Sequence, residues 1–132
     1  MGRIKISLVE NVEWSVIGDR RAGLDPLPEP FLKMAESEMA SSIAFHKLGS
    51  ADEFQVAELN YIPSAEAVVH KHDDDEIMYI AEGEMHLGTQ RLQAGSSVFV
   101  PSDTFYGFKA GAAGLRVILF RAKLDNSVHF KA

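Results

Sequence analysis

The sequence predicts an all-β fold of the sandwich or barrel type, and three observations lead to this prediction. Short apolar or alternating runs follow one another from residue 42 onward, as in sheets built from short strands. Glycines stand at or near the breaks between these runs, where turns favour them. No long helical segment separates the runs, so a parallel α/β sheet is not expected.

The N-terminal third precedes this pattern and carries the one predicted helix. Residues 4–9, "IKISLV", alternate between apolar and polar side chains, which predicts a strand. Residues 18–30 are rich in glycine, proline and charge, and this composition predicts a loop. Residues 30–40, "PFLKMAESEMA", contain good helix formers after a proline that suits the first helical position. We therefore expect one short helix there.

Eight further segments predict strands, and the breaks between most of them are short. They are residues 42–48, 54–62, 66–70, 77–82, 84–87, 97–100, 105–108 and 116–122. Strands of this length and spacing are typical of sandwiches and barrels. The chain has 132 residues and no second domain is apparent, so we expect a single domain over residues 1–132.

Composition narrows the classes of function. Apolar residues make up 46% of the chain and charged residues 24%, as in a globular protein. There is no cysteine, which excludes disulfides, thiolate nucleophiles and zinc–cysteine sites. A net charge of -6 without a basic cluster argues against nucleic acid or anionic membranes as partners. No apolar run has the length of a membrane span or the form of a signal peptide, so we expect a cytoplasmic protein.

The stretch "HKHDDDEIMYIAEG", residues 70–83, carries the strongest functional signal. In an extended strand, side chains two residues apart point the same way, so His70 and His72 share a face. A turn at residues 73–75 would bring Glu76 back beside them. Two imidazoles and a carboxylate suit a divalent transition metal. The alternative is a solvated acidic turn that carries two surface histidines.

The spacing of this stretch resembles the first motif of the cupin superfamily. The pattern His70-x-His72-x3-Glu76-x6-Gly83 matches that motif at each ligand position and at the closing glycine. The family's second motif begins with a glycine, five residues and a proline. Residues 95–101, "GSSVFVP", have this form.

Four positions depart from the family's motifs. Ser64 and Asp103 stand where the motifs have glycine, and Ala110 stands where the second motif has asparagine. Tyr106 replaces the histidine that is the fourth metal ligand. Three roles for Tyr106 stay open: a phenolate ligand, which needs a metal to lower a pKa near 10; a neutral hydrogen-bonding or acid–base group; or a space-filling side chain in a site without metal.

The resemblance implies a cupin jelly-roll β-barrel, or double-stranded β-helix, with one metal site inside. The motifs place the barrel core at about residues 54–122, and residues 1–45 are expected to pack on the barrel or on a partner in a homodimer. The implied ligand set for one divalent transition metal, zinc, iron, nickel or manganese, is His70, His72, Glu76 and, in one of its roles, Tyr106.

Three hypotheses for the function follow, and they differ in the ligand that the barrel holds. The first is a metalloenzyme of dioxygenase, lyase or isomerase type, with Tyr106 as a ligand or as the catalytic acid–base group; the fold does not choose among these reactions. The second is a non-catalytic module that binds or senses a small ligand. The third is a structural barrel without metal.

Several side chains near the motifs belong either to the barrel core or to the lining of a substrate pocket. They are Met78, Ile80, Phe99, Phe105 and Phe108. Two arginines, Arg116 and Arg121, alternate with apolar residues on the last predicted strand. Either they lie on a solvated outer face, or one of them points into the barrel and binds a substrate carboxylate.

Overall fold

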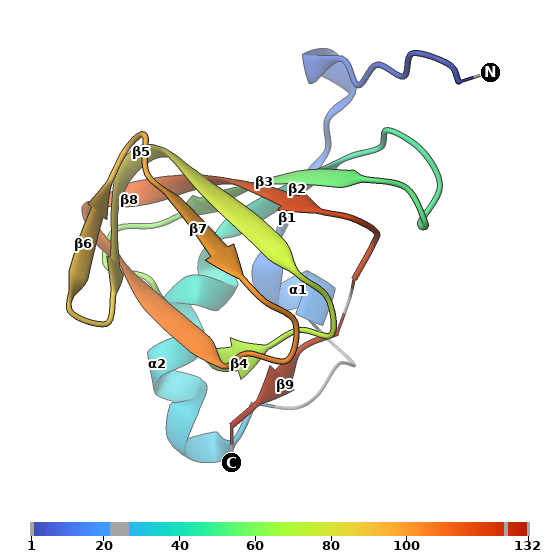
Figure 1. Cartoon of the computed structure of the whole chain (residues 1–132). Coiled ribbons are helices and arrows are strands. Elements are labelled where there is room, and N and C mark those ends of the chain that lie inside the picture. The colour runs from blue at the N-terminus through green and yellow to red at the C-terminus, as the bar shows by residue number, and fades with distance from the viewer. Residues whose placement is uncertain (1, 22–26, 126, 132) are drawn as a thin grey trace.

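The computed structural model describes residues 2–21, 27–125 and 127–131 (Figure 1). The strands are β1 (Trp14–Val16), β2 (Ser42–His46), β3 (Gln55–Tyr61), β4 (Glu66–Lys71), β5 (Glu76–Leu87), β6 (Gln90–Gln93), β7 (Ser97–Val100), β8 (Tyr106–Arg121) and β9 (His129–Phe130). The helices are a 3-10 helix, η1 (Val9–Asn11), and two α-helices, α1 (Ile17–Arg21) and α2 (Glu29–Ala40). Every strand pairing in these ranges is antiparallel, which confirms the predicted all-β class.

One long strand, β8, organises the sheet. Its C-terminal half pairs with β3, its N-terminal end pairs with β4, and β5 pairs with it from Lys109 to Arg121 with register shifts. Strands β2 and β1 continue the sheet from β3, β9 continues it from β4, and β6 and β7 pair with β5. Figure 1 shows the resulting curved sheet. Helix α2 packs against β4, and α1 packs against α2. No helix in the described ranges has the length and apolar character of a membrane span.

Two predicted pairs of strands are single strands in the structure. The sequence predicts breaks at Gly83 and near Gly111 and Gly114, but β5 and β8 run through these glycines. The β5–β8 register shifts next to Gly83, and the φ angles of Gly83 and Gly114 are 81° and 89°. These glycines therefore mark irregularities inside a strand and not turns, which a glycine in a strand pattern also indicates.

We expect Gly83→Ala to destabilise the protein by about 3 kcal/mol. A Cβ atom at Gly83 would overlap the backbone oxygen of Gly114, at a positive φ that side chains rarely adopt. Gly88→Ala is the matched control, because its φ is 59° but no atom lies within 4 Å of the added Cβ; we expect a loss of about 1 kcal/mol. Urea unfolding measures both free energies. Equal losses would mean that the close approach of β5 and β8 does not require Gly83.

Both motif positions that lack their expected glycine keep a glycine-like backbone. Ser64 has a φ of 61° and Asp103 a φ of 58°. Few residues other than glycine adopt such angles. The turn geometry of the two motifs is thus retained although the residues differ.

The helix predicted for residues 30–40 is confirmed as α2. Ser41 follows it and ties its end to the sheet: the Ser41 hydroxyl donates to the carbonyl oxygen of Ser37 at 2.9 Å and accepts from the backbone N–H of Ile62 at 3.1 Å. The elements that the sequence pattern does not predict are η1, β1, α1, β6 and β9, each of five residues or fewer. Segments this short do not display a periodicity.

The predicted strand at residues 4–9 is absent. Residues 2–8 have no regular structure, η1 follows them, and Ile4 and Ile6 are 92% and 73% exposed. Figure 1 shows this N-terminal segment at the edge of the molecule, where Lys5 pairs with Glu53 and Ser7 contacts His46 of β2, whereas β1, α1 and α2 lie against the barrel. Alternation alone produces no strand where no neighbouring strand is available to pair with.

The homodimer stays a prediction, which sedimentation equilibrium would test.

Candidate functional site

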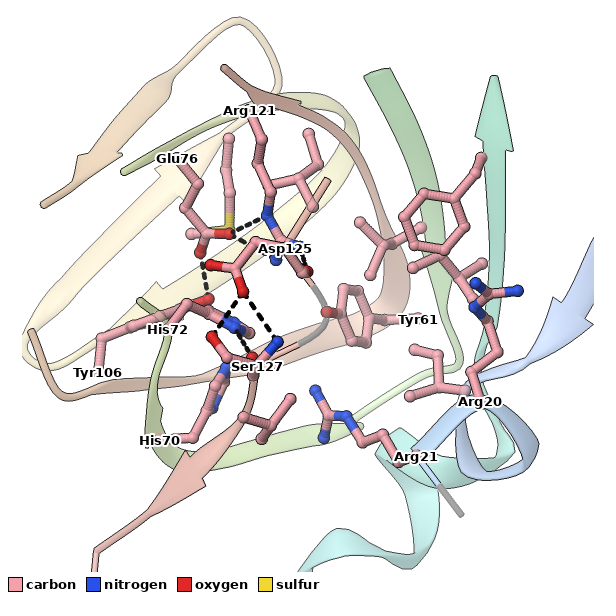
Figure 2. Close-up of a pocket in the computed structure, with 17 residues that line it drawn as sticks. Arg20, Arg21, Tyr61, His70, His72, Glu76, Tyr106, Arg121, Asp125 and Ser127 are labelled. Atoms are coloured by element: carbon pink, nitrogen blue, oxygen red, sulfur yellow. Dashed lines mark hydrogen bonds and ion pairs between the residues drawn. The ribbon is translucent and has the colours of Figure 1, made fainter. Parts of the chain in front are cut away.

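The four predicted metal ligands line one cavity inside the barrel. Its volume is about 230 Å³, and its polar wall contains His70, His72, Glu76 and Tyr106 (Figure 2). Tyr61, Asp125, Ser127, three arginines and several apolar residues complete the lining. The arginines and apolar residues are Arg20, Arg21, Arg121, Ile17, Ile43, Phe45, Leu59, Met78, Leu119 and Val128.

The strand register brings the polar residues together. His70 on β4 lies opposite Tyr106, the first residue of β8. Glu76, the first residue of β5, lies opposite Arg121, the last residue of β8. Directly opposed residues of an antiparallel pair have Cβ atoms about 5 Å apart, so each pair can meet. Both ends of β8 thus contribute to the cavity.

Both histidines are buried, and each has a defined tautomer. The Nδ1 atom of His70 donates to the carbonyl oxygen of Val68 at 2.6 Å, and Nδ1 of His72 donates to the carbonyl oxygen of Ser127. A carbonyl oxygen only accepts, so each Nδ1 carries the proton and each Nε2 keeps its lone pair. Burial, helped by the Arg21 charge, lowers the pKa of His70 to about 3, and burial also lowers the pKa of His72. The two rings are 4.9 Å apart and nearly perpendicular.

Glu76 is a buried carboxylate with both oxygen atoms engaged. One oxygen, Oε1, accepts the hydroxyl hydrogen of Tyr106, and Oε2 accepts from Nε and Nη2 of Arg121 at 3.1 and 2.9 Å. The Glu76 side chain is 1% exposed. Burial and the Glu76 carboxylate raise the pKa of Tyr106 well above its ordinary value. Of the three roles left open by the sequence, these contacts match the neutral hydrogen-bonding group.

A segment near the C-terminus, which the sequence analysis did not single out, helps to enclose the cavity. The Asp125 carboxylate accepts from the backbone N–H of Ser127 at 2.8 Å and from that of Asp74 at 2.9 Å. Arg121 Nη1 donates to the carbonyl oxygen of Asp125 at 2.6 Å. The segment is therefore tied both to the aspartate turn and to the Glu76–Arg121 pair. No periodic signal in the sequence marks Asp125 and Ser127, because their contacts are largely with backbone atoms.

Of the five residues expected at a pocket, Met78 lines the cavity. Ile80 and Phe108 belong to the core and do not line it. Phe99 and Phe105 are 60% and 40% exposed and do not line the cavity, so the expectation that they line a pocket or belong to the core is wrong. Both lie on the outer surface. Strand parity explains Phe99: its partner on β5 is Ile77, which is also exposed, and both side chains point out of the barrel.

Comparison with known proteins adds an independent observation. No protein-family model matches the chain, and no curated protein matches it. Among solved structures, an RmlC-like cupin from Shewanella frigidimarina is 27% identical over 62% of this chain and 76% of its own, with a TM-score of 0.53. The chain is a cupin.

Two further structures resemble this cupin over most of its length. KdgF from Halomonas sp. is 18% identical over 96% of this chain and 98% of its own, with a TM-score of 0.58. A sugar phosphate isomerase from a cupin superfamily, from Silicibacter pomeroyi, is 16% identical over 90% of this chain and 76% of its own, with a TM-score of 0.65. At these identities the likeness establishes the fold, which confirms the predicted cupin barrel.

The donor set of this cupin fits a metal ion only in part. The two histidines fit, because each imidazole directs its proton to a carbonyl oxygen and keeps Nε2 for a ligand, as metal-binding histidines do. Glu76 does not fit, because Arg121 neutralises its charge and Tyr106 occupies its other oxygen. Within the described ranges, no three side chains of histidine or acidic type are arranged around one point that could hold an ion.

Proposed function

We propose that this cupin binds a small organic molecule in the barrel cavity and transfers a proton within it. One observation carries the proposal: the cavity of about 230 Å³ is largely apolar, but its polar wall holds the neutral imidazoles of His70 and His72 and the neutral phenol of Tyr106. An apolar enclosure with a few placed polar groups is typical of small-molecule sites.

The polar wall offers both a proton acceptor and a proton donor. The Nε2 atoms of His70 and His72 can accept from a substrate hydroxyl or C–H acid. The Tyr106 hydroxyl, whose one hydrogen is directed to Glu76 Oε1, can donate to a substrate once it turns from that oxygen. The Glu76–Arg121 pair holds Tyr106 in place. In an isomerisation such groups take a proton from one substrate atom and return a proton to another, and in an elimination the returned proton goes to the departing group. The isomerase named above shares only the fold with this cupin, and a shared fold does not determine the reaction. The proposed reaction type therefore rests on the groups in the cavity.

A ligand-observed NMR screen of small hydroxy, keto and amide compounds tests the binding. We expect compounds that bind the wild type to lose binding in His72→Phe, which removes Nε2 from the cavity wall. His86→Phe is the matched control, because His86 lies on β5 outside the cavity lining. If no compound binds, or if both variants keep the binding, the cavity is not the ligand site.

The same screen separates catalysis from binding. A compound that the wild type converts, and that Tyr106→Phe converts about 10²–10⁴ times more slowly, identifies an enzyme with Tyr106 as the proton donor. A compound that binds and stays unchanged identifies a non-catalytic binding module and overturns the catalytic part of the proposal.

A metal-dependent form of this function is the second candidate, and the tautomers of the two histidines favour it. A bound divalent ion would polarise a substrate oxygen. His70 and His72 would hold the ion, with Glu76 available only after release from Arg121. Elemental analysis of the purified protein beside His70→Ala/His72→Ala decides between the candidates. About one ion per wild-type chain, lost in the variant, supports the metal-dependent form.

A further inference from the structure

The cavity is lined by positive charge although the protein is acidic. The chain has a net charge of -6, yet three arginines, Arg20, Arg21 and Arg121, line the cavity. Arg121 pairs with the lining residue Glu76, and Arg21 pairs with Glu38, which is not a lining residue. The other lining acid, Asp125, accepts backbone N–H groups. The lining thus carries three arginines against two acids, Glu76 and Asp125, and this excess of positive charge favours an anionic ligand.

Arg21, which lines this cavity, has one donor nitrogen without an acceptor in the described part of the chain. Its Nη2 atom pairs with Glu38 at 2.9 Å, and its side chain is 16% exposed. Its Nη1 atom is buried and has no hydrogen-bond acceptor among the described residues. Figure 2 shows the guanidinium pointing from α1 toward the cavity, on the side where His70 lies. A buried N–H without an acceptor is unfavourable, so an acceptor supplied by a ligand would stabilise this arrangement.

We propose that the cavity takes a small organic carboxylate, with the carboxylate on Arg21 and the remainder of the molecule directed toward His70 and His72. This inference rests on the proposed function, because it names the substrate class for the same cavity. A guanidinium edge matches a carboxylate in shape and charge. Glu38 already takes part of the Arg21 charge, which suits a monoanion better than a phosphate dianion.

Glu38 makes the proposal testable in two directions. Its side chain is 1% exposed, and burial raises its pKa despite the Arg21 charge. Glu38 and the ligand carboxylate share one guanidinium, so they compete for it. Removing the Glu38 charge should therefore strengthen carboxylate binding, whereas removing Arg21 should weaken it.

Calorimetric titration with benzoate and with benzamide, a neutral molecule of similar shape, tests the inference. We expect the wild type to prefer benzoate and Glu38→Gln to bind benzoate more tightly by about 3- to 10-fold. Arg21→Met/Glu38→Gln should bind benzoate about 10- to 100-fold more weakly than Glu38→Gln, the range of one charge-assisted hydrogen bond. The double variant removes both members of the buried pair, so that no charge is left alone in the interior. Arg91→Met, at an exposed position of β6, is the matched control and should bind as the wild type does.

The outcomes distinguish this inference from the function on which it rests. Equal binding of benzoate and benzamide, lost for both in His72→Phe, would overturn the carboxylate class and leave the cavity as a small-molecule site. Unchanged benzoate binding in Arg21→Met/Glu38→Gln would overturn the role of Arg21. If neither probe binds, the inference is overturned, and a negative NMR screen would then remove the proposed function as well.

Discussion

Arg121→Met is expected to destabilise the protein by about 3–5 kcal/mol, because it leaves the buried Glu76 carboxylate without its positive partner. Glu76 is 1% exposed at its side chain, and the two Arg121 nitrogens that bond it lie 2.9 and 3.1 Å from Oε2. The substitution also removes the bond from Arg121 Nη1 to the Asp125 carbonyl oxygen. Methionine keeps much of the apolar stem, so the loss reports mainly on charge. Denaturant unfolding measures it.

Two further variants show whether charge is the cause. Glu76→Gln/Arg121→Met removes both charges and keeps an amide oxygen for the Tyr106 hydroxyl, so it should be more stable than Arg121→Met. Arg116→Met lies on the same strand, and its arginine is 40% exposed and paired with Glu58; it should cost less than about 1 kcal/mol. A loss in Arg121→Met no greater than that in Arg116→Met would show that the buried pair does not hold the site together.

The sequence predicts the part of this site that strand parity and motif spacing determine. His70 and His72 are two residues apart on an extended segment, so a shared face follows from the period of a strand. Glu76 and Tyr106 occupy motif positions, and the structure brings both to the same cavity. These are local relations, or relations that a resemblance carries over. They can be predicted without knowledge of how distant strands are aligned.

The remaining contacts depend on long-range register, which the sequence pattern does not contain. Arg121 alternates with apolar residues and fits an outer face equally well; only its pairing opposite Glu76 places it inside. Arg21 lies in a stretch that reads as a loop, and α1 turns it toward the cavity. Phe99 is expected inside the barrel but lies outside it, because an aromatic residue in a strand does not reveal which face of the strand is buried.

Tyr106→His/Arg121→Met is expected to turn the site into a zinc site. The Tyr106 ring lies 4.7 Å from the His70 ring, and its hydroxyl reaches Glu76, so an imidazole at position 106 would join the other three donors. Removing Arg121 frees Oε2 of Glu76. Four donors of nitrogen and oxygen type suit zinc. The ion would also restore the positive charge that Arg121 supplies in the wild type.

Stability with and without zinc measures this conversion. Without zinc the double variant should be less stable than the wild type, and with zinc at about 1,000 times its Kd it should gain about 4 kcal/mol. Adding His72→Asn is the control, because asparagine keeps a short N–H donor but lacks the Nε2 lone pair, and the gain should fall. No gain in the double variant would show that His70 and His72 are not placed for an ion. An equal gain in the wild type would show that Arg121 yields Glu76 to zinc. The metal-dependent candidate would then explain the cavity better than proton transfer without a metal.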